Sequence, residues 1–190
     1  MLPRRCWRTI NKGSAMSKRR RVLAGLLACG LASGVQAATD MKLHGTLVAE
    51  PCVVAAGDDQ VLLDFGEVTN KDLYSTGRTK GKAFQLRLTG CDPAIAKDAR
   101  VTFSGTESSK LPGLLALDGA SLAGGVAIGL ETPAGVALAL DKASEKYPLK
   151  VGSTVIDLQA YVRAEPQAIT DKSLTLGSFS TAATFTLDYP

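Results

Sequence analysis

The fold is decided by the last stretch of the sequence, Gly177-Ser-Phe-Ser-Thr-Ala-Ala-Thr-Phe-Thr-Leu-Asp-Tyr-Pro190. One side of this stretch carries the apolar residues Ala183, Phe185, Leu187 and Tyr189, and the other carries Thr184, Thr186 and Asp188. A period of two with Thr, Phe and Tyr is typical of a half-buried β-strand. A second alternating segment, Met41-Lys-Leu-His-Gly-Thr-Leu47, precedes the first turn signal. We therefore expect one end of the fold to need a partner strand and the other to carry a spare one.

Residues 1–37 are expected to be a leader and not part of the fold. Lys18-Arg-Arg-Arg21 is a positive cluster, Val22–Val35 is a short apolar stretch, and Val35-Gln-Ala37 supplies the small residues of a cleavage site. The apolar run is too short and too rich in Gly and Ala for the roughly 20 residues of a membrane span.

The start of the leader and its processing have alternatives. Met16, just ahead of the basic cluster, is a better start than Met1. A lipoprotein signal is the other reading, because Leu26-Leu-Ala-Cys29 resembles a lipobox. That reading leaves a very short apolar segment and ignores the cleavage site at Ala37.

Removal of the leader reverses the net charge. Eight of the 22 lysines and arginines lie in residues 1–37, and none of the 18 acids does. The remaining chain therefore carries 14 basic and 18 acidic residues, a net charge of −4. Nucleic-acid binding needs clustered Lys and Arg on the folded domain, so no nucleic-acid partner is expected.

Two cysteines remain after the leader, Cys52 and Cys91. Two cysteines in an exported chain most simply form one disulfide. It would close a loop of about 40 residues and contribute roughly 4 kcal/mol on the chain-entropy model. Two free buried thiols are the alternative.

The remaining residues, about 150, are enough for one domain with a core. Their punctuation by Gly, Pro and Asp turns predicts an all-β sandwich or barrel. A brief helical turn is expected at Ala94–Asp98. The expected strands are Leu43–Val48, Val61–Phe65, Phe84–Leu88, Val101–Ser104, Val126–Glu131, Val155–Val162 and Ala182–Tyr189.

The residue inventory argues against an enzyme. His44 is the only histidine, and it lies far from any strand–turn–helix nucleophile elbow. No Cys/His spacing suggests zinc, and no glycine-rich loop suggests a nucleotide. Asp58, Asp59 and Asp92 are better explained as turn-capping acids than as calcium ligands. No catalytic residue, metal or cofactor is expected.

Both ends of the chain resemble the pilin subunits of bacterial chaperone–usher fimbriae. Asp40–Cys52 is similar to the donor extension and first strand of these subunits, and Leu86-Arg-Leu-Thr-Gly-Cys91 to the strand that carries the second cysteine. Gly177, fourteenth from the end, and Tyr189, next to last, reproduce the C-terminal pilin pattern. The segments most similar to minor tip or adaptor subunits of the type 1 and P-pilus type are Val101–Glu107, Leu111-Pro-Gly113 and Ala160–Pro166.

The resemblance implies an incomplete immunoglobulin-like sandwich of six strands, with the seventh supplied in trans and one disulfide. It divides the chain into the leader 1–37, a donor-strand extension 38–48 and a pilin domain 49–190. It also implies a periplasmic pilus chaperone, an outer-membrane usher and neighbouring fimbrial subunits as partners. The destination would be a fimbrium on the bacterial surface, reached through the periplasm.

The same resemblance assigns residues to the two halves of a strand exchange. Lys42, His44 and Thr46 would point away from the neighbour's groove, and Pro190 departs from the family's C-terminal pattern. In the donor strand, the residues facing the groove of a neighbouring subunit would be Thr39, Met41, Leu43, Gly45 and Leu47. In the acceptor groove, walled by about Val48–Val54 and the last strand, the residues meeting the chaperone or the donor would be Gly177, Ala183, Phe185, Leu187 and Tyr189.

The glycine at position 45 has two possible explanations. A side chain there would be blocked wherever the neighbour's groove is shallow, which favours glycine. A bulge in an ordinary first strand is the alternative.

The expected function is therefore that of a minor or adaptor subunit that polymerises by strand donation and supports adhesion. The alternative is a self-contained periplasmic or lipid-anchored β-sandwich that binds a ligand such as a glycan. A secreted hydrolase is the third reading, and it lacks a catalytic base.

Overall fold

The computed structural model describes residues 44–47 and 49–190. The expected leader and Thr39, Met41 and Leu43 of the expected donor strand lie outside this part. Thr46–Pro190 forms one compact unit. The expected strand Leu43–Val48 is not formed at residues 44–47, which have no regular secondary structure and are exposed. A strand needs a neighbour to pair with, and the periodicity of this segment does not supply one.

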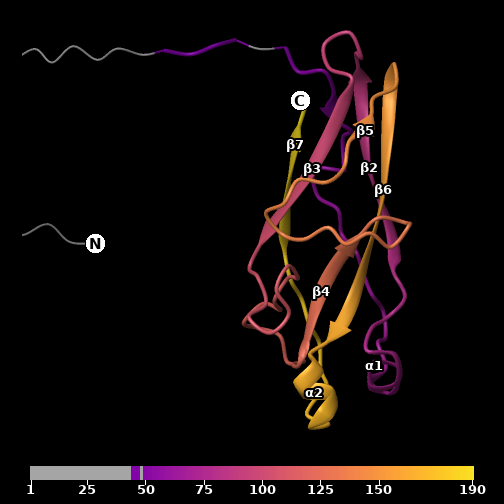
Figure 1. Cartoon of the computed structure of the whole chain (residues 1–190), viewed down its shortest axis with the longest axis vertical. Helices are drawn as coiled ribbons and strands as arrows, with labels where there is room; N and C mark the ends of the chain where they lie inside the picture. The colour runs from indigo at the N-terminus through magenta and orange to yellow at the C-terminus, as the bar shows by residue number, and fades with distance from the viewer. Residues whose placement is uncertain (1–43, 48) are drawn as a thin grey trace, which may run out of the picture. The chain divides into compact units, whose positions relative to one another are not determined.

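Two antiparallel sheets make up the fold, as expected for an all-β sandwich (Figure 1). In the first sheet the strands lie in the order β1 (Val53–Val54), β2 (Lys82–Cys91), β6 (Gly152–Ala164) and β4 (Val126–Glu131). In the second sheet the order is β5 (Tyr147–Pro148), β3 (Asp98–Gly105) and β7 (Ala183–Asp188). The strands expected in β2, β3, β4, β6 and β7 are therefore present, with ends that differ by a few residues.

The core forms where the inward-facing residues of both sheets meet. In the first sheet Leu86 of β2 lies opposite Ile156 of β6, and both are buried. In the second sheet Phe103 of β3 lies opposite Phe185 of β7. Alternation with a period of two puts these residues on one face of each strand, so both sheets bury an apolar surface against the other.

Two short helices were not expected from the sequence. Thr69 caps α1 (Asn70–Thr76) by accepting a hydrogen bond from the Asp72 amide at 3.3 Å. Proline stands in the first turn of α2 (Pro166–Thr170). Helices of 7 and 5 residues are too short to show a helical period in the sequence. The helical turn expected at Ala94–Asp98 is a tight turn closed by a hydrogen bond from the Ile95 amide to the Asp92 carbonyl (3.1 Å), and β3 already begins at Asp98.

The strand expected at Val61–Phe65 is wrong, although its alternation is real. Leu63 and Phe65 pack against the core, and Leu62 is 96% exposed. Among the described residues no backbone–backbone hydrogen bond involves this segment, so it has the burial pattern of a strand without the pairing.

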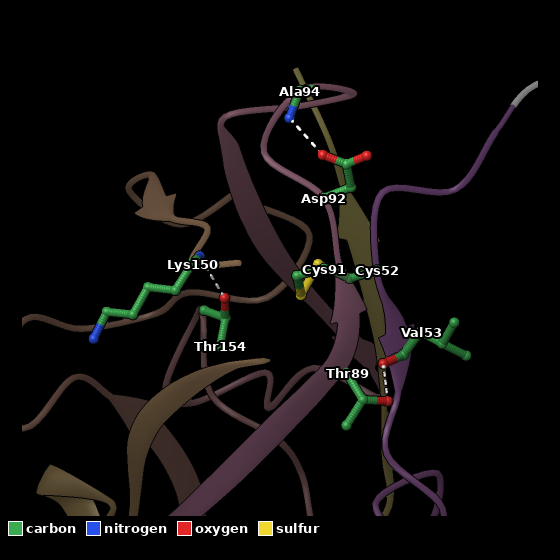
Figure 2. The surroundings of a disulfide bond; sticks show 8 residues. All are labelled: Cys52, Val53, Thr89, Cys91, Asp92, Ala94, Lys150 and Thr154. Atoms are coloured by element: carbon green, nitrogen blue, oxygen red, sulfur yellow. Dashed lines mark hydrogen bonds between the residues drawn. A yellow bond between two sulfur atoms is a disulfide. The ribbon is translucent and has the colours of Figure 1, made fainter. Parts of the chain in front are cut away.

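Cys52 and Cys91 form the expected disulfide, with their Cα atoms 4.2 Å apart. The bond joins the residue before β1 to the last residue of β2 (Figure 2). Both cysteines are buried, and the Thr89 hydroxyl donates a hydrogen bond to the Val53 carbonyl beside them (3.3 Å). The disulfide therefore fixes the short strand β1 at the end of β2.

We expect the disulfide to be a large part of the stability of the domain. Replacing both Cys52 and Cys91 by Ser should lower the free energy of unfolding by up to about 4 kcal/mol, because the unfolded chain loses a closed loop. Urea unfolding of the full chain and of the variant, each with and without dithiothreitol, measures this. A reductant that shifts the unmodified chain and the variant equally would contradict the prediction.

Candidate strand-binding groove

One edge of β7 is unpaired among the described residues. On its other side β7 pairs with β3 from Arg100 opposite Asp188 to Gly105 opposite Ala183. Within the part of the chain that the structure describes, no backbone hydrogen bond reaches the second edge of β7. Unpaired backbone N–H and C=O groups in a row are a template for another strand.

A second unpaired backbone lies across from this edge. We call residues Asp59–Val68 the wall segment; it runs from the region of β1 to α1 (Figure 1). None of its residues takes part in a backbone–backbone hydrogen bond among the described residues. Backbone polar groups in folded proteins are nearly always paired, most often with other backbone groups, so ten consecutive residues without a backbone–backbone hydrogen bond are unusual.

An apolar groove separates the wall segment from β7. A first cavity of about 690 Å³ is bounded by Val61–Phe65 on one side and Thr181–Phe185 on the other. Its floor is made of core side chains, namely Phe84, Leu86, Phe103, Leu115, Ile128, Leu130 and Ala160. A second cavity of about 640 Å³ continues toward α1, between Leu63–Asn70 and Leu174–Phe179. The groove therefore gives access to the hydrophobic core along much of the domain.

Two phenylalanines meet where the cavities adjoin. Phe65 belongs to the wall segment and lines both cavities, and Phe179 lies opposite, six residues before Phe185 of β7. Their ring centroids are 6.0 Å apart with an interplanar angle of 41°. Tilted aromatic pairs at this distance attract each other, so the two rings link the wall segment to the chain that leads to β7.

The structure places the expected groove residues unequally. Ala183 and Phe185 line the first cavity, and Gly177 lines the second. Leu187 and Tyr189 are half-buried against the core but line neither cavity. Burial raises the pKa of the Tyr189 hydroxyl, with a further contribution from the nearby Glu50 carboxylate.

The expectation that Val48–Val54 forms one wall of the groove has to be corrected. Of its described residues only Val54 lines the cavity, because β1 is paired with β2 and the chain then leaves the sheet edge. The groove side is formed instead by the wall segment. The apolar alternation at Val61–Phe65 is visible in the sequence, but the same alternation is typical of an ordinary paired strand. Of the expected donor residues, Gly45 and Leu47 are described, and both are exposed.

A buried carboxylate, that of Asp58, lies where the chain after β1 turns away from the edge of β2. Asp58 is 5% exposed and accepts three hydrogen bonds from Arg87 of β2: from the backbone N–H (2.9 Å), from Nε (2.9 Å) and from Nη2 (2.6 Å). These hydrogen bonds lower the pKa of the Asp58 carboxyl. Asp58 therefore stays ionised and closes the turn that begins at Ala55.

Contacts within the same chain explain why residue 177 is a glycine. Its φ is +152°, and a Cβ there would lie 2.6 Å from Cβ of Leu122 and 3.0 Å from the Leu122 carbonyl carbon. Only glycine lets the segment that leads to β7 pass so close to the backbone of residues 122–123. This close approach shapes the side of the second cavity.

The groove is lined mainly by apolar side chains. Among the described residues no group of three or more His, Cys, Asp or Glu side chains could hold a metal ion. The helices of that same part are all too short or too polar to cross a membrane. What the groove presents is apolar surface and unpaired backbone.

A family model described as Fimbrial protein matches residues 41–190. The chain belongs to the fimbrial protein family. PapK of Escherichia coli, a fimbrial adapter, is 33% identical over 170 residues, which cover 86% of this chain and 95% of PapK.

Solved structures share the fold of this fimbrial protein. The P pilus rod subunit PapA has a TM-score of 0.64 at 23% identity and covers 74% of this chain and 100% of PapA. A subunit from the structure of a chaperone–usher pilus has a TM-score of 0.63 at 24% identity and covers 82% and 97%. These likenesses confirm the immunoglobulin-like sandwich, and the family match with the similarity to PapK confirms the resemblance to pilin subunits.

Gly177→Ala should destabilise the fimbrial domain, because the new methyl group would overlap Leu122 at a backbone conformation that favours glycine. We expect a loss of about 1–3 kcal/mol in the free energy of urea unfolding. Gly119→Ala is the matched control, since a Cβ at Gly119 meets no atom within 4 Å. Equal effects of the two substitutions would remove the packing explanation for Gly177.

Proposed function

We propose that this fimbrial protein is a minor or adaptor subunit that polymerises by exchanging β-strands. Its groove accepts an extended segment from a second molecule, and its own residues 38–48 are donated to the next subunit. The observation that supports this most directly is the apolar groove between the free edge of β7 and the unpaired wall segment. The similarity to the adapter PapK supports the minor-subunit role.

An extended chain is the ligand class that suits such a groove. Its N–H and C=O groups can pair with β7, and alternate side chains can enter the cavities over the core. A globular ligand or a glycan would satisfy the apolar floor or the backbone edges, but not both. This argument favours strand exchange over the self-contained, ligand-binding sandwich.

The donor half of the proposal rests on the sequence and on exposure. Thr39, Met41, Leu43, Gly45 and Leu47 share one face of an extended segment. Leu47 is fully exposed in the structure, as a side chain that packs in another molecule would be. Exposed unpaired strands are an aggregation hazard, so the groove would be covered by a periplasmic chaperone before an outer-membrane usher assembles the fibre. The subunit then belongs to a fimbrium on the cell surface and supports adhesion.

A synthetic peptide of residues Ala38–Glu50 tests the acceptor groove. We expect the peptide to bind the full chain, raise its urea midpoint and protect the β7 amides from hydrogen exchange, because it completes the sheet. The control is the same peptide with Gly45→Leu, which should bind much more weakly because a leucine side chain would be blocked where the groove is shallow. A chain that stays a soluble monomer and ignores both peptides is the self-contained sandwich, and strand exchange is then wrong.

Gly45→Leu in the whole subunit tests the donor role. Gly45 is exposed, so the substitution should leave the domain folded while it blocks insertion into a neighbour's groove and incorporation into fibres. Thr46→Leu adds a similar side chain on the opposite face and is the matched control. Electron microscopy of fibres and urea unfolding of the two variants give the result. Normal fibres from Gly45→Leu would count against donation by this segment.

A further inference from the structure

The turn between β1 and the wall segment changes which residues face the core. Val54 of β1 packs against the core and Val53 is 58% exposed, so even-numbered residues face inward there. In the wall segment Leu63 and Phe65 pack against the core and Leu62 is exposed, so odd-numbered residues face inward. The turn at Ala55–Asp58, with Gly57 at φ +92°, produces this shift of one residue.

The shift prevents the wall segment from continuing β1 along the edge of β2. Val54 lies opposite Leu88 in an antiparallel pair, so a continued strand would place Ala56 opposite Leu86 and Asp58 opposite Phe84. Leu86 is buried and Phe84 packs against the core, so the Asp58 carboxylate would enter the hydrophobic interior. A one-residue slip of a strand turns its whole apolar set to the wrong face, and this path is therefore unfavourable.

Pairing of the wall segment with the free edge of β7 would not bury Asp58 in this way. A wall segment that keeps Leu63 and Phe65 inward could move toward β7 and pair with it. That movement would satisfy both unpaired backbones and close the groove. Some interaction must therefore hold the wall segment on the β2 side.

Two long side chains of β2 provide that interaction. Arg87 holds Asp58, the residue just before the wall segment, through three hydrogen bonds, and Lys82 Nζ donates to the carbonyl oxygen of Asp64 near the middle of the segment. No backbone–backbone hydrogen bond reinforces them in the described part of the chain. The wall segment is therefore tethered by side chains, whereas a strand of a β-sandwich is held by backbone hydrogen bonds to its neighbour.

We propose that Asp58, Arg87 and Lys82 are positioning residues that keep the strand-binding groove open by tethering the wall segment to β2. The inference rests on the proposed function, because it concerns the same groove. Without the tethers the wall segment pairs with β7, and an incoming strand must displace it before it can bind. The tethers thus set the fraction of molecules that are ready to accept a strand.

Asp58→Asn in the full chain tests the proposal. It removes the charge that Arg87 binds and nearly preserves the shape of the side chain. We expect the Ala38–Glu50 peptide to bind about tenfold more weakly, because apparent affinity falls with the fraction of open molecules. In the peptide-free chain, hydrogen exchange by NMR should show increased protection of the Val61–Phe65 amides.

The sign of the exchange result separates positioning from simple destabilisation. A residue that only stabilised the fold would, when replaced, decrease protection everywhere, including in β6. Asp98→Asn is the matched control: it breaks the Asp98–Lys146 ion pair (3.4 Å), which lines neither cavity, and should change neither peptide affinity nor wall protection. Arg87→Lys keeps the backbone N–H and a cation, so its effect should be smaller than that of Asp58→Asn.

Lys82→Met gives an independent test if Asp58→Asn does not fold. It removes only the second tether, and it should increase wall protection and weaken peptide binding in the same direction. If the unmodified chain binds no peptide, the proposed function itself fails. If the unmodified chain binds and both tether variants bind equally well with an unprotected wall segment, strand exchange stands and the tether proposal is overturned.

Discussion

The structure depends on one unsatisfied pairing. β7 offers a row of backbone groups to a neighbour, and the nearest chain, Asp59–Val68, does not pair with it. Between them lies direct access to Leu86, Ile128 and the rest of the core. Unpaired backbone and exposed apolar floor each cost free energy, and one extended segment relieves both at once. The site is thus defined by what the fold lacks, which explains why no catalytic or metal-binding arrangement is needed to account for it.

The strands on both sides of the groove are fixed by contacts with the rest of the domain, whereas the wall segment has few such contacts. The disulfide fixes β1 to the end of β2, and β2 is paired along its length with β6. On the other side of the groove, β3 is the one strand paired with β7 in the described part of the chain. Ser178 and Ser180, which precede β7, accept backbone hydrogen bonds from residues 118–123. Gly177 permits that close approach. The frame around the groove is therefore well connected, whereas the wall segment is not.

The sequence predicted the elements whose burial and pairing coincide. β2, β3, β4, β6 and β7 alternate cleanly and lie beside a partner, and the cysteine pair followed from the count after the leader. At Val61–Phe65 the same alternation misled, because a period of two reports one buried face and says nothing of backbone pairing. Helices of one or two turns and two-residue strands such as β5 leave no period to detect.

The groove could be located only in part for a related reason. Ala183 and Phe185 were identified from the alternation of the last strand, and both line the first cavity. The opposite side was placed too early in the chain, at Val48–Val54. Its true position depends on the contact between Asp58 and Arg87, which are 29 residues apart in the sequence. An ion pair whose arginine is more than half exposed is a weak source of stability, because solvent screens the attraction. Its value here lies in selecting one path for the chain: it makes the continuation along β2 unfavourable and keeps the wall segment away from β7, so the domain is left with a groove.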